Sequence, residues 1–102
     1  MKALNPDELK ELRADVKRRG GVLGGTNNRA TVSFNDGTYT LTSYYTVVCR
    51  YNPTTNTFIK LWGGYSATTI KHINLFLDTF NKRGFNKHDW ISLDCNKAYT
   101  LD

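Results

Sequence analysis

The period of the apolar residues changes along this 102-residue chain, and that change limits the possible folds more than any other feature. Apolar residues have a helical period between 5 and 19, alternate with polar residues between 29 and 62, and return to the helical period between 66 and 80. A run of strands between helices is typical of α+β proteins, whose helices cover one face of an antiparallel sheet. The sequence therefore predicts a three- to four-stranded antiparallel sheet packed against two helices, in the order α-β-β-β-α-β.

The first predicted helix has clear start and stop signals. Asn5 and Glu8 are spaced as a capping box around Pro6, which suits the first helical position. Gly20-Gly21 is expected to end this helix. The residues that follow, 22–28, are rich in turn formers and have no period, so we expect a mobile connection.

The second predicted helix begins at Ser66 and has a broader apolar face, formed by Ile70, Ile73, Phe76, Leu77 and Phe80. Gly84 is placed as the left-handed residue that ends it. Because this helix is the more apolar of the two, we expect it to form most of the core. A short strand is predicted for Trp90–Leu93.

Three strands are predicted between the helices. The first, 30–34, is followed by the hairpin turn Asn35-Asp36-Gly37. The second is a long strand, 39–51, with a bulge or bend near Ser43-Tyr44, and the third is 57–62. Alternation predicts a set of core positions on these strands that comprises Tyr39, Leu41, Tyr45, Val47, Cys49, Ile59 and Leu61.

Length and composition indicate one folded domain over residues 1–102, because 39% of the residues are hydrophobic and 13% are aromatic. No apolar run approaches the roughly 18 residues that a membrane span needs. The first residues also lack the apolar stretch of a signal peptide. We therefore expect a protein of the cytoplasm, with no membrane partner.

The reactive side chains of the sequence do not form a recognisable catalytic or metal-binding motif. Cys49 and Cys95 are far apart in sequence and do not form a CxxC or a cysteine–histidine cluster. We expect Cys49 to be a small buried residue, with a disulfide to Cys95 as the alternative. An enzyme would need Cys49 or His72 exposed in a pocket. The prediction is therefore a non-enzymatic protein without a metal, a cofactor or a small-molecule substrate.

The chain is basic, and this is the most informative functional signal. Lys and Arg total 14 against 9 Asp and Glu, giving a net charge of +5 and a pI of about 9.4. Five cations fall within ten residues of the first helix, namely Lys10, Arg13, Lys17, Arg18 and Arg19. With exposed aromatic residues beside it, such a surface suits a phosphate backbone and unpaired bases. A basic face that serves only solubility is the alternative.

Two short segments carry a family resemblance. The first, residues 43–48, includes Ser43-Tyr44-Tyr45-Thr46, which reads as a Ser-Tyr-x-Thr strand. The second, residues 63–76, includes Tyr65-Ser66-Ala67-Thr68-Thr69-Ile70-Lys71-His72, which reads as a Tyr-Ser-x-Thr-Thr-x-x-His helix start. These segments resemble short uncharacterised proteins of phages and mobile elements, of the anti-CRISPR-like type. The resemblance implies a phage-type accessory protein of a bacterial host cell that binds an RNA-guided Cas nuclease complex and blocks DNA binding or cleavage.

The basic charge distinguishes this chain from inhibitors that mimic DNA with an acidic surface. The resemblance therefore implies contact with guide RNA, target DNA or an acidic protein surface. Arg13, Lys17, Arg18 and Arg19 are the predicted charge contacts, and Tyr44, Tyr65 and Lys71 are a second group around the resembling motif. The alternative function is a small basic nucleic-acid-binding module without catalysis.

Overall fold

The computed structural model describes residues 4–18 and 20–101, and within them the chain forms an α+β structure of three helices and five strands. The elements are α1 (Pro6–Arg18), β1 (Ala30–Asn35), β2 (Thr38–Ser43), β3 (Thr46–Asn52), β4 (Thr57–Lys60), α2 (Ala67–Asp78), α3 (Lys87–Ser92) and β5 (Ala98–Thr100). The predicted α+β class is confirmed. The expected three to four strands and two helices understated the number of elements.

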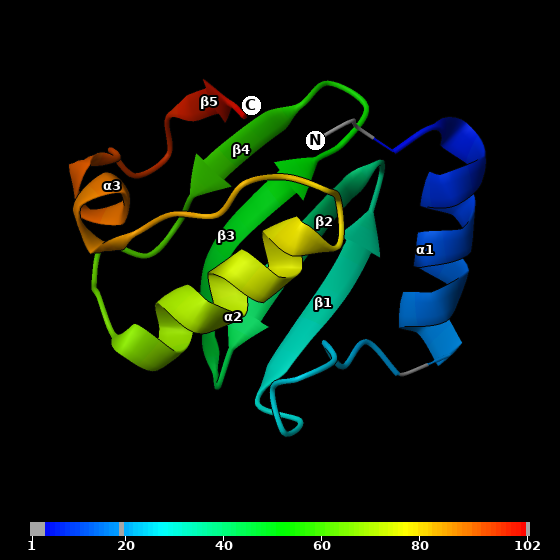
Figure 1. The fold of residues 1–102 in the computed structure, drawn as a ribbon, viewed down its shortest axis with the longest axis horizontal. Helices are drawn as coiled ribbons and strands as arrows, with labels where there is room; N and C mark the ends of the chain where they lie inside the picture. The colour runs from blue at the N-terminus through cyan, green and yellow to red at the C-terminus, as the bar shows by residue number, and fades with distance from the viewer. Residues whose placement is uncertain (1–3, 19, 102) are drawn as a thin grey trace.

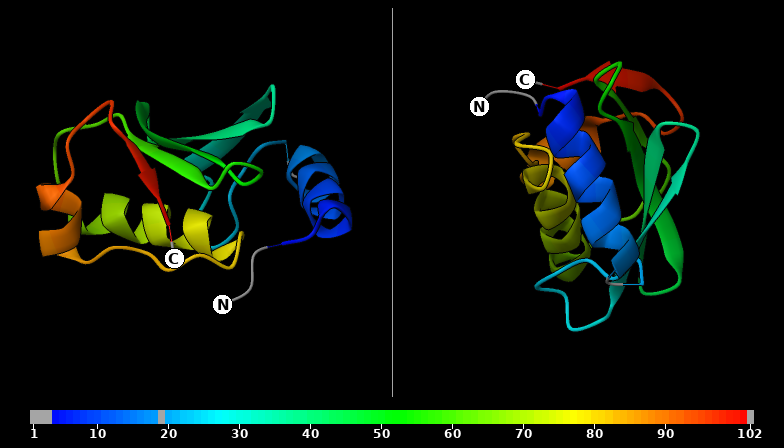
Figure 2. Two further views of the ribbon diagram at one scale, coloured as in Figure 1. Left: turned by 90° about the horizontal axis from the view of Figure 1, so that it is seen from above. Right: turned by 90° about the vertical axis from the view of Figure 1, so that its right-hand side faces the viewer.

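The strands form one antiparallel meander in the order β1-β2-β3-β4-β5 (Figure 1). Helices α2 and α3 lie on one face of this sheet, and α1 lies beyond its β1 side (Figure 2). The opposite face carries short polar side chains such as Thr40, Thr42 and Thr57, and none of the described helices covers it. The packed face contains the core.

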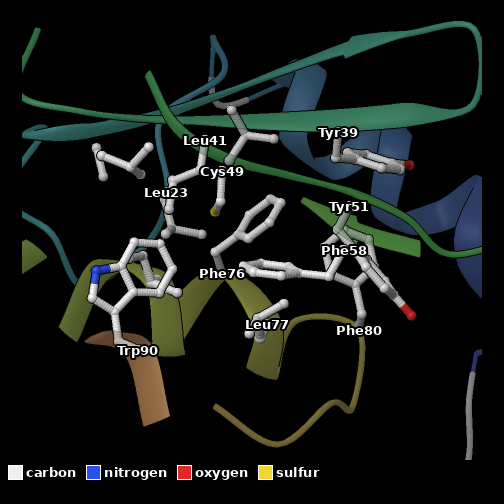
Figure 3. Close-up of a cluster of buried hydrophobic side chains, with 14 residues drawn as sticks. Leu23, Tyr39, Leu41, Cys49, Tyr51, Phe58, Phe76, Leu77, Phe80 and Trp90 are labelled. Carbon is white, nitrogen blue, oxygen red and sulfur yellow. The ribbon is translucent and has the colours of Figure 1, made fainter. Parts of the chain in front are cut away.

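Helix α2 supplies the centre of the core, as expected. Ser66 caps it, because the Ser66 hydroxyl accepts a hydrogen bond of 3.0 Å from the backbone N–H of Thr69. Aromatic rings from this side of the molecule pack together under the sheet, among them Phe76, Phe80 and Tyr51 (Figure 3). Their mutual edge-to-face contacts add to the free energy that burial provides.

The end of α2 differs from the prediction. The helix stops at Asp78, and Asn81 rather than Gly84 takes the left-handed conformation, with φ of 58°. Gly84 is required for a different reason, since a Cβ atom there would overlap the side chain of Asn74. That side chain is fixed by two hydrogen bonds to the backbone of Phe85.

The predicted strand 39–51 is two strands. The chain reverses at Tyr44-Tyr45, so that β2 and β3 pair as a hairpin with Ser43 opposite Thr46. A register shift then places both Val48 and Cys49 in the core. The prediction that Tyr45 and Val47 are core residues was therefore wrong, because the turn and the bulge each interrupt the alternation.

Strand β4 buries the opposite set of residues from the one predicted. Phe58 and Lys60 face the core, whereas Ile59 and Leu61 are only partly buried. Lys60 is accommodated because its ammonium group donates to the carbonyl oxygens of Trp90 and Leu93, at 2.8 and 3.1 Å. These carbonyls end α3, where a cation is favourable.

Two segments are more regular than the sequence suggested. Residues 87–92 form α3, not a strand, because the Asn86 side chain caps this helix. The connection 22–28, expected to be mobile, instead has Leu23 and Thr26 buried. It is fixed by a β-bridge between Val22 and Thr31 and by the hydrogen bond from Leu23 N to Ala30 O.

Candidate binding surface

The predicted cations of α1 that the structure describes are all exposed. Asn5 and Glu8 form the expected capping box, with hydrogen bonds of 3.0 and 2.8 Å, and no residue of α1 is buried. Lys17 and Arg18 lie in the last turn, and Arg18 forms an exposed ion pair of 3.0 Å with Asp15. Arg19 lies outside the described residues. The helix therefore displays charge at its C-terminal end.

Arg13 is exposed but is already engaged within the molecule. Its guanidinium carbon lies 4.9 Å from the centre of the Phe34 ring, which stands at the end of β1. This cation–π contact helps to hold α1 against the β1 side of the sheet. Arg13 therefore differs from Lys17, for which the structure gives no such contact.

The turn between β2 and β3 presents two tyrosines to solvent. Tyr45 is 100% exposed and Tyr44 is 45% exposed. Tyr44 has a φ of 56° at the first position of a two-residue hairpin loop, where glycine is the usual residue. A bulky residue in this conformation costs roughly 1–3 kcal/mol and persists only when its surroundings hold it. One such restraint is the hydrogen bond of 2.6 Å from Tyr44 N to Arg29 O.

A buried polar network lies directly beneath this turn. Ser43 and His72 are 2% and 4% exposed, and the Ser43 hydroxyl is 2.8 Å from His72 Nδ1. The same hydroxyl lies 3.4 Å from that of Thr69. Burial lowers the pKa of His72, and the charges of Lys71 and Arg29 lower it further. The imidazole is therefore neutral near pH 7 and serves to anchor the hairpin to α2.

This network explains why the two segments of the resemblance meet. Ser43 comes from one segment, and Thr69 and His72 come from the other. The ring of Tyr44 lies over the same histidine, with 5.8 Å between ring centres. The buried members of the two motifs thus hold the hairpin to α2, whereas Tyr44 and Lys71 are exposed.

Several basic and aromatic residues lie along one edge of the molecule. In Figure 1 the C-terminal end of α1, the start of β1, the β2–β3 turn and the N-terminal half of α2 all reach the lower edge, with α1 at the right and the start of α2 at the left. We call this region the basic end and define it by Lys17, Arg18, Arg29, Tyr44, Tyr45 and Lys71.

The acidic side chains are distributed differently. Asp7, Glu8 and Glu11 lie in the N-terminal half of α1, and Asp36 lies in the β1–β2 turn at the other end of β1. At the basic end, Asp15 faces Arg18. The basic end thus has four described cations, of which Arg18 is paired with Asp15.

The structure separates Tyr65 from this group. The Tyr65 ring is contacted by Lys87 of α3, whose ammonium nitrogen is 5.2 Å from the ring centre.

Two members of the basic end, Arg29 and Tyr45, were not predicted as binding residues. Arg29 stands alone before a strand, and Tyr45 follows an alternation that assigned it to the core. The alternation of apolar and polar residues runs through the β2–β3 turn without a break, so the sequence did not indicate a turn there.

Other candidate sites offer less chemistry. Cys49 is completely buried and burial raises the pKa of its thiol, while Cys95 is exposed and both are free. A polar hollow of about 390 Å³ on the open sheet face is lined by residues that include Arg50, Asn52 and Thr57. Among residues 4–18 and 20–101, no group of three or more His, Cys, Asp or Glu side chains is arranged to hold a metal ion.

In the part of the chain that the structure describes, every helix is too short or too polar to span a bilayer.

The fold and the basic end define a small α+β protein with a cationic, aromatic surface. Comparison by sequence assigns the chain further: residues 22–92 match the model of a family of unknown function, DUF8033. The chain belongs to this family. No curated protein and no solved structure matches it. The matched segment contains the β2–β3 turn, the polar network and α2, whereas α1 lies outside it.

Proposed function

We propose that the protein is a non-enzymatic binding protein whose basic end contacts the phosphate backbone of a nucleic acid. The observation that carries this proposal is that Lys17, Arg18, Arg29 and Lys71 are all exposed and belong to segments that reach the same edge of the molecule (Figure 1). Cations in such an arrangement release the counterions that condense on nucleic acids.

The burial of Cys49, Ser43 and His72 supports a binding role over catalysis by these three residues. The Cys49 thiol and the His72 ring are both enclosed, and the Ser43 hydroxyl that meets His72 is enclosed with it. A nucleophile and base of an enzyme need to be accessible to the reacting atoms.

The particular biological setting that we propose is inhibition of an RNA-guided Cas nuclease complex in a bacterial cell. Its support is the resemblance of residues 43–48 and 63–76 to phage and mobile-element proteins. In this setting the basic end would bind guide RNA, target DNA or an acidic protein surface of the complex. A general nucleic-acid-binding module is the alternative setting for the same surface.

A charge-reversal experiment tests the nucleic-acid contact. We expect the double variant Lys17→Glu/Arg18→Glu to bind bare DNA and RNA more weakly. The slope of log K against log salt concentration is expected to be smaller in magnitude by about 1.5, because each lost phosphate contact removes about 0.7–0.9 from it. The variant Arg83→Glu/Lys97→Glu makes the same change in net charge away from the basic end and is the matched control. Equal losses in both variants would contradict the proposed surface.

A pull-down separates the two settings. Tagged protein is recovered from a lysate of CRISPR-carrying bacteria, with and without complete nuclease digestion, and bound proteins are identified by mass spectrometry. A Cas protein that stays bound after digestion supports the inhibitor. Loss of all bound proteins on digestion supports the general module.

A further inference from the structure

We infer that the β2–β3 turn is a stacking site for unpaired nucleobases, so that the nucleic acid bound at the basic end is single-stranded. This inference rests on the proposed function and names its substrate class. Its basis is the geometry of Tyr44 and Tyr45, together with the two cations that lie beside them.

Tyr45 has an aromatic ring that contributes nothing to the folded core. Its side chain is 100% exposed, although the flanking strands bury Leu41, Ser43 and Cys49 completely or almost so. A large exposed ring at a hairpin tip is available for contact with another flat ring. Every nucleobase has such a π-face, which is why aromatic side chains bind single strands with little sequence preference.

The second ring is held in a fixed position. Tyr44 lies against His72, which the Ser43 hydroxyl fixes from below, and Arg29 holds the Tyr44 backbone by a hydrogen bond. Tyr44 has a positive φ, a conformation that glycine would adopt without strain. A preorganised ring loses little conformational entropy when a base stacks on it.

Charge beside the rings matches the strand that carries the bases. The Arg29 guanidinium lies 5.9 Å from the centre of the Tyr44 ring, and Lys71 is exposed on α2 next to His72. Arg29 is therefore near enough for a phosphate that flanks a base stacked on Tyr44. Duplex DNA and RNA keep their bases stacked on one another. Their phosphates can therefore contact the cations, but their bases cannot stack on the tyrosine rings.

The open face of the sheet does not offer an equivalent platform. Its central positions are Thr40, Arg50 and Ile59, and the neighbouring positions on this face are also mostly short and polar. Single-strand binding across a sheet relies on aromatic side chains at such positions. The most exposed aromatic rings of the described residues are those of the turn, Tyr45 at 100% and Tyr44 at 45%, ahead of Phe34 at 38% and Tyr65 at 37%.

The test compares a single-stranded oligothymidine with a duplex of equal length, both labelled, in fluorescence anisotropy at fixed salt. We expect the wild type to prefer the single strand. Tyr45→Ala is expected to weaken single-strand binding about 5- to 150-fold, the range that the loss of one stacked base gives, and to leave duplex binding unchanged. Tyr45→Phe keeps the ring and is expected to retain the preference. Ile91→Ala removes an exposed apolar side chain from α3 and is the matched control.

The outcomes separate the inference from the function beneath it. Equal affinity of the wild type for duplex and single strand, or unchanged binding by Tyr45→Ala, overturns the stacking site and leaves the basic end as a phosphate-binding surface. If Tyr45→Ala keeps its oligothymidine affinity but loses a Cas protein in the pull-down, the turn is a protein-binding surface and the inference is wrong. Absence of binding to either nucleic acid overturns the proposed function together with the inference.

Discussion

Helices α1 and α2 are nearly equal in length, at 13 and 12 residues, yet they relate to the rest of the molecule in opposite ways. Both have a polar N-cap, Asn5 in one and Ser66 in the other. Helix α2 buries five residues, including Ile73, Phe76 and Leu77, whereas α1 buries none. Capping decides where a helix begins, and the amount of apolar surface decides whether it becomes part of the core.

The two helices also have different roles in the proposed binding surface. The match to the family model includes α2 and the hairpin that it supports, and it leaves out α1. On this account α2 holds the β2–β3 turn through the network of Ser43 and His72, and α1 adds the charges of Lys17 and Arg18 to the same end. The proposed stacking site at the β2–β3 turn and the charges of Lys17 and Arg18 thus come from separate parts of the chain.

The largest expected difference between the helices is in core truncation. Phe76→Ala is expected to lower the free energy of unfolding by about 3–5 kcal/mol, because it leaves a cavity between α2 and the sheet. Leu12→Ala in α1 removes a partly buried side chain and is expected to cost less than about 1 kcal/mol. Urea denaturation followed by circular dichroism measures both. Similar losses in the two variants would contradict the peripheral position of α1.

The caps give a smaller and sharper comparison. Ser66→Ala is expected to cost about 1 kcal/mol in global stability, since α2 cannot unravel without opening the core. Asn5→Ala removes a cap of the same kind but is expected to increase fraying of α1 with little change in the unfolding midpoint. Amide hydrogen exchange in α1 and the urea midpoint report the two effects. An Asn5→Ala variant as unstable as Ser66→Ala would show that the helices are equally integrated.

The smallest expected effect is a dependence on pH that comes from α2. The pKa of His72 in the folded protein is below its ordinary value of 6.5, so the unfolded chain takes up the proton first as the pH falls. Stability is therefore complete above about pH 6.5 and declines below it. His72→Gln is expected to remove this part of the pH dependence, and His88→Gln, which alters an exposed histidine, to leave it in place. A pH profile that is the same in both variants would contradict the assignment to His72.

Much of the fold could be predicted because its signals are local. The capping box of Asn5 and Glu8, the cap at Ser66 and the positive φ of Asp36 and Gly37 in the β1–β2 turn all depend on residues close in sequence. A local signal for α3 was also present, since Asn86 accepts a hydrogen bond from Asp89 N, but the apolar residues that follow it favoured a strand.

The parts that could not be predicted depend on distant contacts. Two tyrosines form the β2–β3 turn without any turn-forming residue, and this turn is held by the hydrogen bond from Tyr44 N to the distant Arg29 O. Lys60 can be buried because the carbonyl oxygen of Trp90 in α3, 30 residues away, accepts a hydrogen bond from its ammonium group. Of the candidate site, Lys17, Arg18, Tyr44 and Lys71 were predicted from charge and motif. Arg29 and Tyr45 join them only through the fold.

The central claim is that one end of the molecule, built from α1 and from the hairpin on α2, binds a single-stranded nucleic acid. Titration of isotope-labelled protein with single-stranded oligothymidine, followed by backbone NMR shifts, tests it most directly. The account predicts the largest shifts at Arg29, Tyr44, Tyr45 and Lys71, with smaller ones at Lys17 and Arg18. Shifts centred on Arg50 and the open face of the sheet, or no shifts at all, would contradict it.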